Sequence, residues 1–135
     1  MIVDDEIMNL EILLNLLEVK GHPCDTTLSG SEAIEMVAKR LHRFETDGTA
    51  FYKLILLDFS MPIVDGPQVA RQITKLFAES QALSESGERP KIFCCSAYNS
   101  KDFKRQAIDA GMDKFFTKPI SSDDLDHFLK LASLV

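Results

Sequence analysis

The sequence lacks the patterns that mark a membrane span, a targeting signal or a nucleic-acid surface. No apolar run approaches the roughly 20 residues that cross a bilayer, and no basic flank followed by an apolar stretch begins the chain. The formal net charge is -6, so the clustered Lys and Arg that replace phosphate counterions are missing. We therefore expect a cytoplasmic segment that contacts neither membrane nor nucleic acid directly, which is compatible with a parent protein anchored in a membrane.

Cysteine is scarce as well. Cys24, Cys94 and Cys95 are odd in number and none stands at a C-x-x-C spacing. This excludes a disulfide framework and a zinc site as the basis of the fold, and favours a reducing compartment. Cys94 and Cys95 lie in an apolar run, which is typical of cysteines that behave as small buried hydrophobes.

The remaining pattern predicts one α/β domain over residues 1–135, because 45% hydrophobic residues in 135 is enough for one continuous core. Two polar stretches, 45–50 and 80–90, are predicted as loops that are too short to be domain linkers. Apolar spacing predicts strands at 1–3, 24–28, 52–57, 91–95 and 114–117, alternating with helices at 9–19, 31–44, 66–76, 100–110 and 121–134. Such alternation predicts right-handed strand-helix-strand units, and hence a parallel sheet with helices on both faces.

Polar residues follow four of these strands. In sheets of this kind ligands bind beyond the carboxyl ends of the strands, and those positions hold Asp4 and Asp5, Asp58, Ser96 and Lys118. Three carboxylates at one edge repel one another and need a compensating cation. Ligands that are all oxygen favour a hard ion such as Mg²⁺.

Together these groups suit phosphoryl transfer. A divalent cation and the ammonium of Lys118 could hold a phosphoryl group against Asp58, whose carboxylate is a competent nucleophile. The hydroxyl of Ser96 could then donate to a phosphoryl oxygen. Each residue taken alone has an ordinary structural interpretation, such as a helix cap, a loop hydroxyl or a solvated charge. Their joint position at the strand ends favours the functional interpretation.

Four motifs in this order resemble the receiver domains of two-component and phosphorelay systems: Val3-Asp4-Asp5-Glu6, the segment from Leu57 to Gly66 with Asp-x-x-Met-Pro-x-x-Asp-Gly, Cys95-Ser96-Ala97, and Lys118-Pro119. The resemblance covers essentially the whole chain. It implies a flavodoxin-like, doubly wound five-stranded parallel sheet in the order 2-1-3-4-5, and a cis peptide at Lys118-Pro119. Asn9 and the two predicted loops make the chain most similar to the receivers of hybrid histidine kinases.

The same resemblance implies a role for each site residue. Asp58 would be the phosphoacceptor, and Asp5, Asp58 and the backbone carbonyl of Ser60 would bind Mg²⁺, with Asp4 acting through water. Ser96 and Lys118 would contact the phosphoryl group. Ser96 and Phe115 would form the conformational switch, although Phe115 also fits a plain core aromatic.

Function follows from these roles as an expectation. The domain would take a phosphoryl group from a histidine kinase or a histidine phosphotransfer protein, and it would catalyse its own phosphorylation and dephosphorylation as a signalling module. Ser60 and Tyr98 would flank the attacking water, and Tyr98 would slow hydrolysis. A second apolar stripe on the first helix, at Ile12 and Leu16, would dock the partner, unless that helix is buried all round.

Other interpretations fit less well. An aspartyl-phosphate phosphatase resembles Asp-x-Asp, but Ser60 holds the position of the second carboxylate. A flavin-binding module needs a Ser, Thr and Gly-rich loop where this chain has Asp4-Asp5-Glu6. A receiver-like interaction module that is never phosphorylated is the alternative function. The first strand is short, with only Met1 to Val3 before the acids, which predicts a fragment of a longer multidomain protein.

Overall fold

A computed structural model describes residues 1–134. Its centre is one five-stranded parallel sheet in the order β2-β1-β3-β4-β5, which confirms the strand order that the family resemblance implied. The strands are β1 (Ile2–Val3), β2 (Thr26–Thr27), β3 (Leu54–Asp58), β4 (Lys91–Ser96) and β5 (Lys114–Thr117). The helices are α1 (Ile7–Val19), α2 (Gly30–Asp47), α3 (Gly66–Glu79), α4 (Gln81–Ser86), α5 (Lys101–Asp109) and α6 (Ser122–Leu131).

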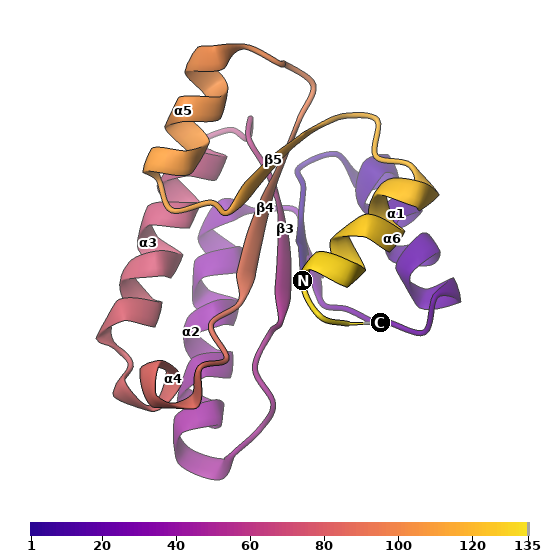
Figure 1. Cartoon of the computed structure of the whole chain (residues 1–135). Coiled ribbons are helices and arrows are strands. Elements are labelled where there is room, and N and C mark those ends of the chain that lie inside the picture. Colours follow the sequence, from indigo (N-terminus) through magenta and orange to yellow (C-terminus); the bar gives the residue numbers. More distant parts are fainter. Residues whose placement is uncertain (135) are drawn as a thin grey trace.

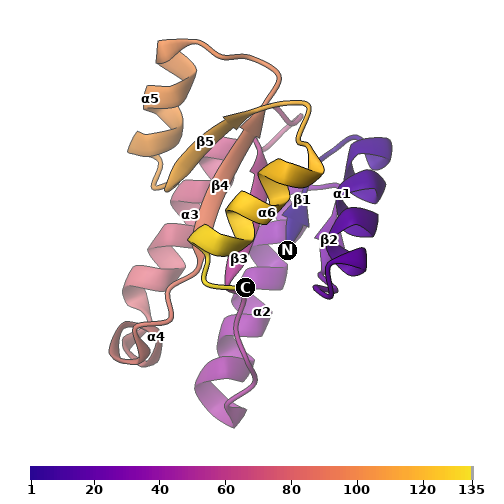
Figure 2. The ribbon, with the colours of Figure 1, turned by 45° about the vertical axis from the view of Figure 1, so that its right-hand side comes forward.

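The helices cover both faces of the sheet. Helices α2, α3 and α5 lie on one face, and α1 and α6 lie on the other (Figures 1 and 2). Strand β3 runs through the middle and is buried along its whole length. Its side chains alternate between two cores, since Ile55 and Leu57 join the α2–α3 side while Leu54 and Leu56 join the α1–α6 side. This two-faced burial explains why the strand reads as an unbroken apolar run.

The apolar periodicity located the core faces of the helices correctly. Helix α1 buries Leu10, Leu13 and Leu17. Cys94 and Cys95 are buried in β4, as predicted for small hydrophobes. The cysteines of the described residues are free thiols.

Both predicted loops were partly wrong. Helix α2 continues through Glu45 to Asp47 and ends only at Gly48, which adopts a φ of 75° that favours glycine. The stretch 80–90 contains α4, a helix that the sequence did not predict. It is capped by the hydroxyl of Ser80, and its side chain Leu83 is buried, with 1% exposed. The periodicity missed this helix because a six-residue segment with one buried side chain carries no helical repeat.

Candidate functional site

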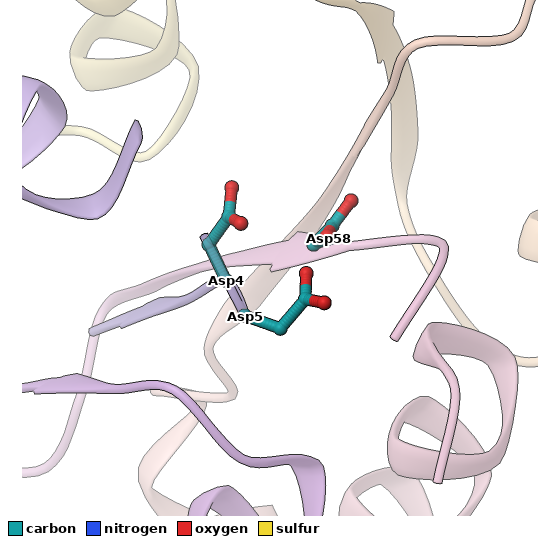
Figure 3. A group of neighbouring side chains, drawn as sticks. All are labelled: Asp4, Asp5 and Asp58. Atoms are coloured by element: carbon teal, nitrogen blue, oxygen red, sulfur yellow. The ribbon is translucent and has the colours of Figure 1, made fainter. Parts of the chain in front are cut away.

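Side chains from four strand ends meet at the carboxyl edge of the sheet. Asp58 is the last residue of β3 and Ser96 the last of β4, while Asp4 and Asp5 follow β1 and Lys118 follows β5. Figure 3 shows Asp4 and Asp5 beside Asp58. One carboxylate oxygen from each of these three acids lies within 4.8 Å of the others. The structure thus brings together the acids that the sequence placed at separate strand ends.

Lys118 bridges two of the acids. Its Nζ donates to Asp58 Oδ1 at 3.1 Å and to Asp4 Oδ2 at 2.9 Å. Its backbone N–H donates to the Ser96 carbonyl at 2.7 Å, which ties the β5 end to the β4 end. The sequence placed Lys118 at the same sheet edge as Asp4 and Asp58, and the structure adds that its ammonium pairs with both acids at once.

Asp4 is held on three sides. It is 2% exposed. Its Oδ1 accepts the Glu6 N–H at 2.9 Å, and its own N–H donates to the Thr27 carbonyl at 3.2 Å. Asp5 is exposed, so its carboxylate is the acid of the cluster most open to solvent.

The site opposes the ionisation of Asp58. Burial, reinforced by the negative charge of Asp4 and a hydrogen bond with Asp5, raises the pKa of Asp58 to about 7, although Lys118 acts in the other direction. Burial lowers the pKa of Lys118, but the hydrogen bonds to Asp4 and Asp58 and the negative charges of these acids outweigh that effect and raise the pKa, so the amine stays charged. One ammonium therefore compensates the acid cluster only in part.

These donors fit a hard divalent cation. Mg²⁺ prefers oxygen ligands and commonly takes one or two carboxylates while keeping several waters. Among residues 1–134, Asp4, Asp5 and Asp58 form the single group of acids, histidines or cysteines with metal-ligand spacing. A cation here would offset both the burial and the negative charge of Asp4, which together raise the pKa of Asp58.

A cavity of about 520 Å³ opens next to these groups. Its lining includes Asp4, Asp58, Lys118, Ser60, Tyr98 and Ile12. Ser96 is 1% exposed, and its Oγ accepts the Tyr98 N–H at 3.0 Å. The hydroxyl hydrogen of Ser96 therefore stays available for another acceptor.

Phe115 is half-buried on β5. Its ring packs edge-on against Phe59 with centroids 6.5 Å apart, and Lys104 Nζ lies over the ring, 6.0 Å from its centroid. The ring thus sits between the core and the α5 surface. This placement is compatible both with a core aromatic and with a residue that moves between two positions.

Fold and site together define a receiver-type α/β domain, with an acid cluster and a lysine at the carboxyl edge of a 2-1-3-4-5 sheet. The family model of the response regulator receiver domain matches residues 1–130. The chain belongs to this family.

The chain matches short segments of much longer signalling proteins. The chain is 32% identical to hybrid signal transduction histidine kinase L of Dictyostelium discoideum over 130 residues, which is 96% of the chain and 7% of that protein. It is 27% identical to the aerobic respiration control sensor protein ArcB of Escherichia coli over 96% of the chain and 14% of that protein. The chain thus spans a small fraction of these relatives.

Solved structures agree with the fold. The receiver domain of the histidine kinase CKI1 from Arabidopsis thaliana, complexed with Mg²⁺, matches with a TM-score of 0.82 and 26% identity over 96% of this chain and 88% of that chain. Chemotaxis protein CheY4 of Vibrio cholerae has a TM-score of 0.77 at 19% identity over 97% and 94% of the two chains, which supports the fold alone. Within residues 1–134, every helix is too short or too polar to span a bilayer.

Proposed function

We propose that this receiver domain accepts a phosphoryl group on Asp58 in a Mg²⁺-dependent phosphorelay. The observation that carries the proposal is the bridging position of Lys118, whose ammonium contacts Asp58 and Asp4 inside a cluster of three acids. A structural ion pair would need one acid. A second acid beside the first, and a third facing solvent, leave negative charge that suits a divalent cation.

The chemistry is a transfer between two nucleophiles. An Asp58 carboxylate oxygen attacks the phosphorus of a phosphohistidine, an O–P bond forms as the P–N bond breaks, and the imidazole leaves with the bonding electron pair. Mg²⁺, bound by Asp5, Asp58 and the Ser60 carbonyl with Asp4 acting through water, would neutralise charge on the transferring group. Lys118 contributes the second positive charge, and Ser96 donates its hydroxyl to a phosphoryl oxygen.

The switch would use Ser96 and Phe115. Movement of the Ser96 hydroxyl toward the phosphoryl oxygens would free space beside β4, and the half-buried ring of Phe115 could then move inward. Lys104 Nζ lies over that ring, 6.0 Å from its centroid, and would lose this contact. Phosphorylation would thereby change the surface formed by α5 and β5.

The domain would also catalyse its own dephosphorylation by hydrolysis. Water attacks the phosphorus, the acyl O–P bond breaks, and Asp58 returns to a carboxylate as inorganic phosphate leaves. Ser60 and Tyr98 line the cavity through which this water would enter. The Tyr98 side chain is large and would lengthen the lifetime of phospho-Asp58.

Mass spectrometry after incubation with acetyl phosphate tests the acceptor assignment. We expect a Mg²⁺-dependent addition of one phosphoryl group that EDTA prevents and that Asp58→Asn abolishes. Asp109→Asn, a matched change at an exposed acid on α5, should be labelled like the wild type. Labelling of Asp58→Asn, or labelling that persists in EDTA, would refute the assignment.

The phosphodonor would be a histidine kinase or a histidine phosphotransfer protein that docks on α1. Met8 and Ile12, one turn apart, are 73% and 53% exposed, and Ile12 lines the cavity that contains Asp58. Leu16, predicted to share this stripe, is instead half-buried and packs against the α1–α6 core. We therefore propose that the docking stripe is formed by Met8 and Ile12, nearer the acceptor than the predicted Ile12 and Leu16.

Ile12→Asp should slow transfer from a phosphohistidine protein while leaving labelling by acetyl phosphate unchanged. Val19→Asp provides the control, because Val19 is 87% exposed at the far end of the same helix. Equal transfer rates for both variants would rule out this docking surface.

The parent protein would be a hybrid histidine kinase, in which residues 1–135 form the receiver segment of a longer multidomain chain. The relatives support this, since their names are those of hybrid kinases and the chain covers only a small part of each. The domain would act in the cytoplasm, where three unpaired thiols stay reduced.

A further inference from the structure

The loop that joins β3 to α3 is strained at its tip. Residues 60–65 carry the Ser60 carbonyl, and the Val64 N–H donates to the Pro62 carbonyl at 2.8 Å. Ile63 between them adopts a φ of 69° and is 97% exposed. A turn of this kind is rare, and positive φ is costly for a β-branched residue by about 1–3 kcal/mol. Such a conformation persists only where its surroundings enforce it.

Two glycines supply close backbone contacts at the C-terminal side of this loop. A Cβ at Gly66 would collide with the carbonyl of Asp58 and with the backbone of Phe59, so the start of α3 lies directly against the acceptor strand. A Cβ at Gly30 would lie 2.7 Å from the Val64 carbonyl oxygen and 2.7 Å from Cγ2 of Val69 on α3. Gly30 is the first residue of α2, which therefore presses on the loop from the other side.

The segment 27–30 also touches the other half of the site. The Thr27 carbonyl accepts the Asp4 N–H at 3.2 Å, and Thr27 Oγ1 accepts the Ser29 N–H at 3.2 Å. Four consecutive residues thus contact the backbone of Asp4 at one end and the backbone of Val64 at the other. The β2–α2 junction therefore lies between Asp4 and the 60–65 loop, the two chain segments whose oxygens would hold the cation.

We propose that Gly30 is a positioning residue for the metal site. By allowing α2 to approach Val64, Gly30 holds the strained loop and its Ser60 carbonyl at a constant distance from Asp4 and Asp5. A side chain at residue 30 would push the loop outward, let the turn at Ile63 relax and separate the oxygen donors. This inference rests on the proposed Mg²⁺ site.

Gly30→Ala and Gly111→Ala form a matched pair that separates positioning from packing. A Cβ at Gly111 would lie 2.7 Å from Thr74 Cγ2, as close as the contact at Gly30, but on α3 away from the acid cluster. Gly111 also has a φ of 98°, so Gly111→Ala should cost at least as much stability. Isothermal titration with Mg²⁺ measures affinity for each variant, and urea unfolding in EDTA measures stability.

We expect Gly30→Ala to weaken Mg²⁺ binding by at least about tenfold, the usual effect of losing a residue that supports metal ligands. Gly111→Ala should bind Mg²⁺ within twofold of the wild type despite an equal or larger loss of stability. Equal Mg²⁺ affinities for Gly30→Ala and the wild type would overturn the inference. Equal weakening in both variants would also overturn it, because the effect would then be general destabilisation.

Val64→Ala keeps the test decisive if Gly30→Ala does not fold. It removes the two methyl groups with which the loop residue Val64 packs against the core, introduces no overlap, and should also weaken Mg²⁺ binding by freeing the loop. Wild-type affinity in Val64→Ala would then count against the inference. If the wild type bound no Mg²⁺, the proposed metal site itself would be refuted, and the positioning role with it. This outcome is distinguishable from failure of the positioning role alone, because it depends on the wild type and not on any variant.

Discussion

Asp58→Asn should make the metal-free protein more stable, although it removes the acceptor. Asp58 is 5% exposed, and its pKa of about 7 lies above its ordinary value of 3.8, mainly because burial disfavours the charge. A difference of this size corresponds to about 4 kcal/mol of opposition to the ionised form. Asn keeps the shape of the side chain and carries no charge, so folding no longer has to bury a negative charge at this position.

The measured gain in the free energy of unfolding should be smaller than about 4 kcal/mol. Water and buffer cations can reach the acid cluster, and Asn offers Lys118 a weaker acceptor than a carboxylate does. We expect Asp58→Asn to raise the free energy of unfolding by about 2 kcal/mol in EDTA at pH 8, measured by urea denaturation. Asp109→Asn should change it by less than about 0.5 kcal/mol, because an exposed acid away from such features has little effect.

The pH dependence has a defined sign. Between pH 3.8 and about 7 the folded protein holds a proton on Asp58 that the unfolded chain has lost, so this group makes wild-type stability fall as pH rises. The advantage of Asp58→Asn should therefore be absent near pH 4, grow up to pH 7 and stay constant above it. If Asp58→Asn were less stable than the wild type at pH 8 in EDTA, the charge of Asp58 would be compensated by Lys118 and the reasoning would be wrong.

Four further predictions concern the metal, the added helix, the strained turn and hydrolysis. Millimolar Mg²⁺ should raise the melting temperature of the wild type but not that of Asp5→Asn, and a shift of equal size in both would exclude Asp5 as a ligand. Leu83→Ala should destabilise the protein by about 2–5 kcal/mol in urea unfolding, whereas a negligible loss would mean that α4 is dispensable. Ile63→Gly should stabilise the protein by about 1 kcal/mol if the positive φ is strained, and a destabilised variant would contradict that assignment. Tyr98→Ala should speed the loss of the phosphoryl group from Asp58 severalfold in a mass-spectrometric time course, and an unchanged rate would reject a role for this ring.

The site was predictable in outline because parallel sheets bring their carboxyl ends to one edge. The apolar runs ending at Asp58 and Ser96 located two strand ends. The general rule that ligands bind beyond the carboxyl ends of such strands then predicted where the site lies. Helix α4 was not predictable in this way. A single buried side chain, Leu83, is enough to dock six residues on an existing core, but it leaves no period in the sequence.

The sequence by itself determined the fold class, the central strands and the identity of the acids, hydroxyl and amine at the sheet edge. These features depend on local periodicity and on the order of elements along the chain. Only the tertiary structure decided that Lys118 binds Asp4 as well as Asp58, and that Gly30 lies against Val64. Both are contacts between segments distant in sequence, set by how helices and strand ends pack in three dimensions, and no residue spacing records them.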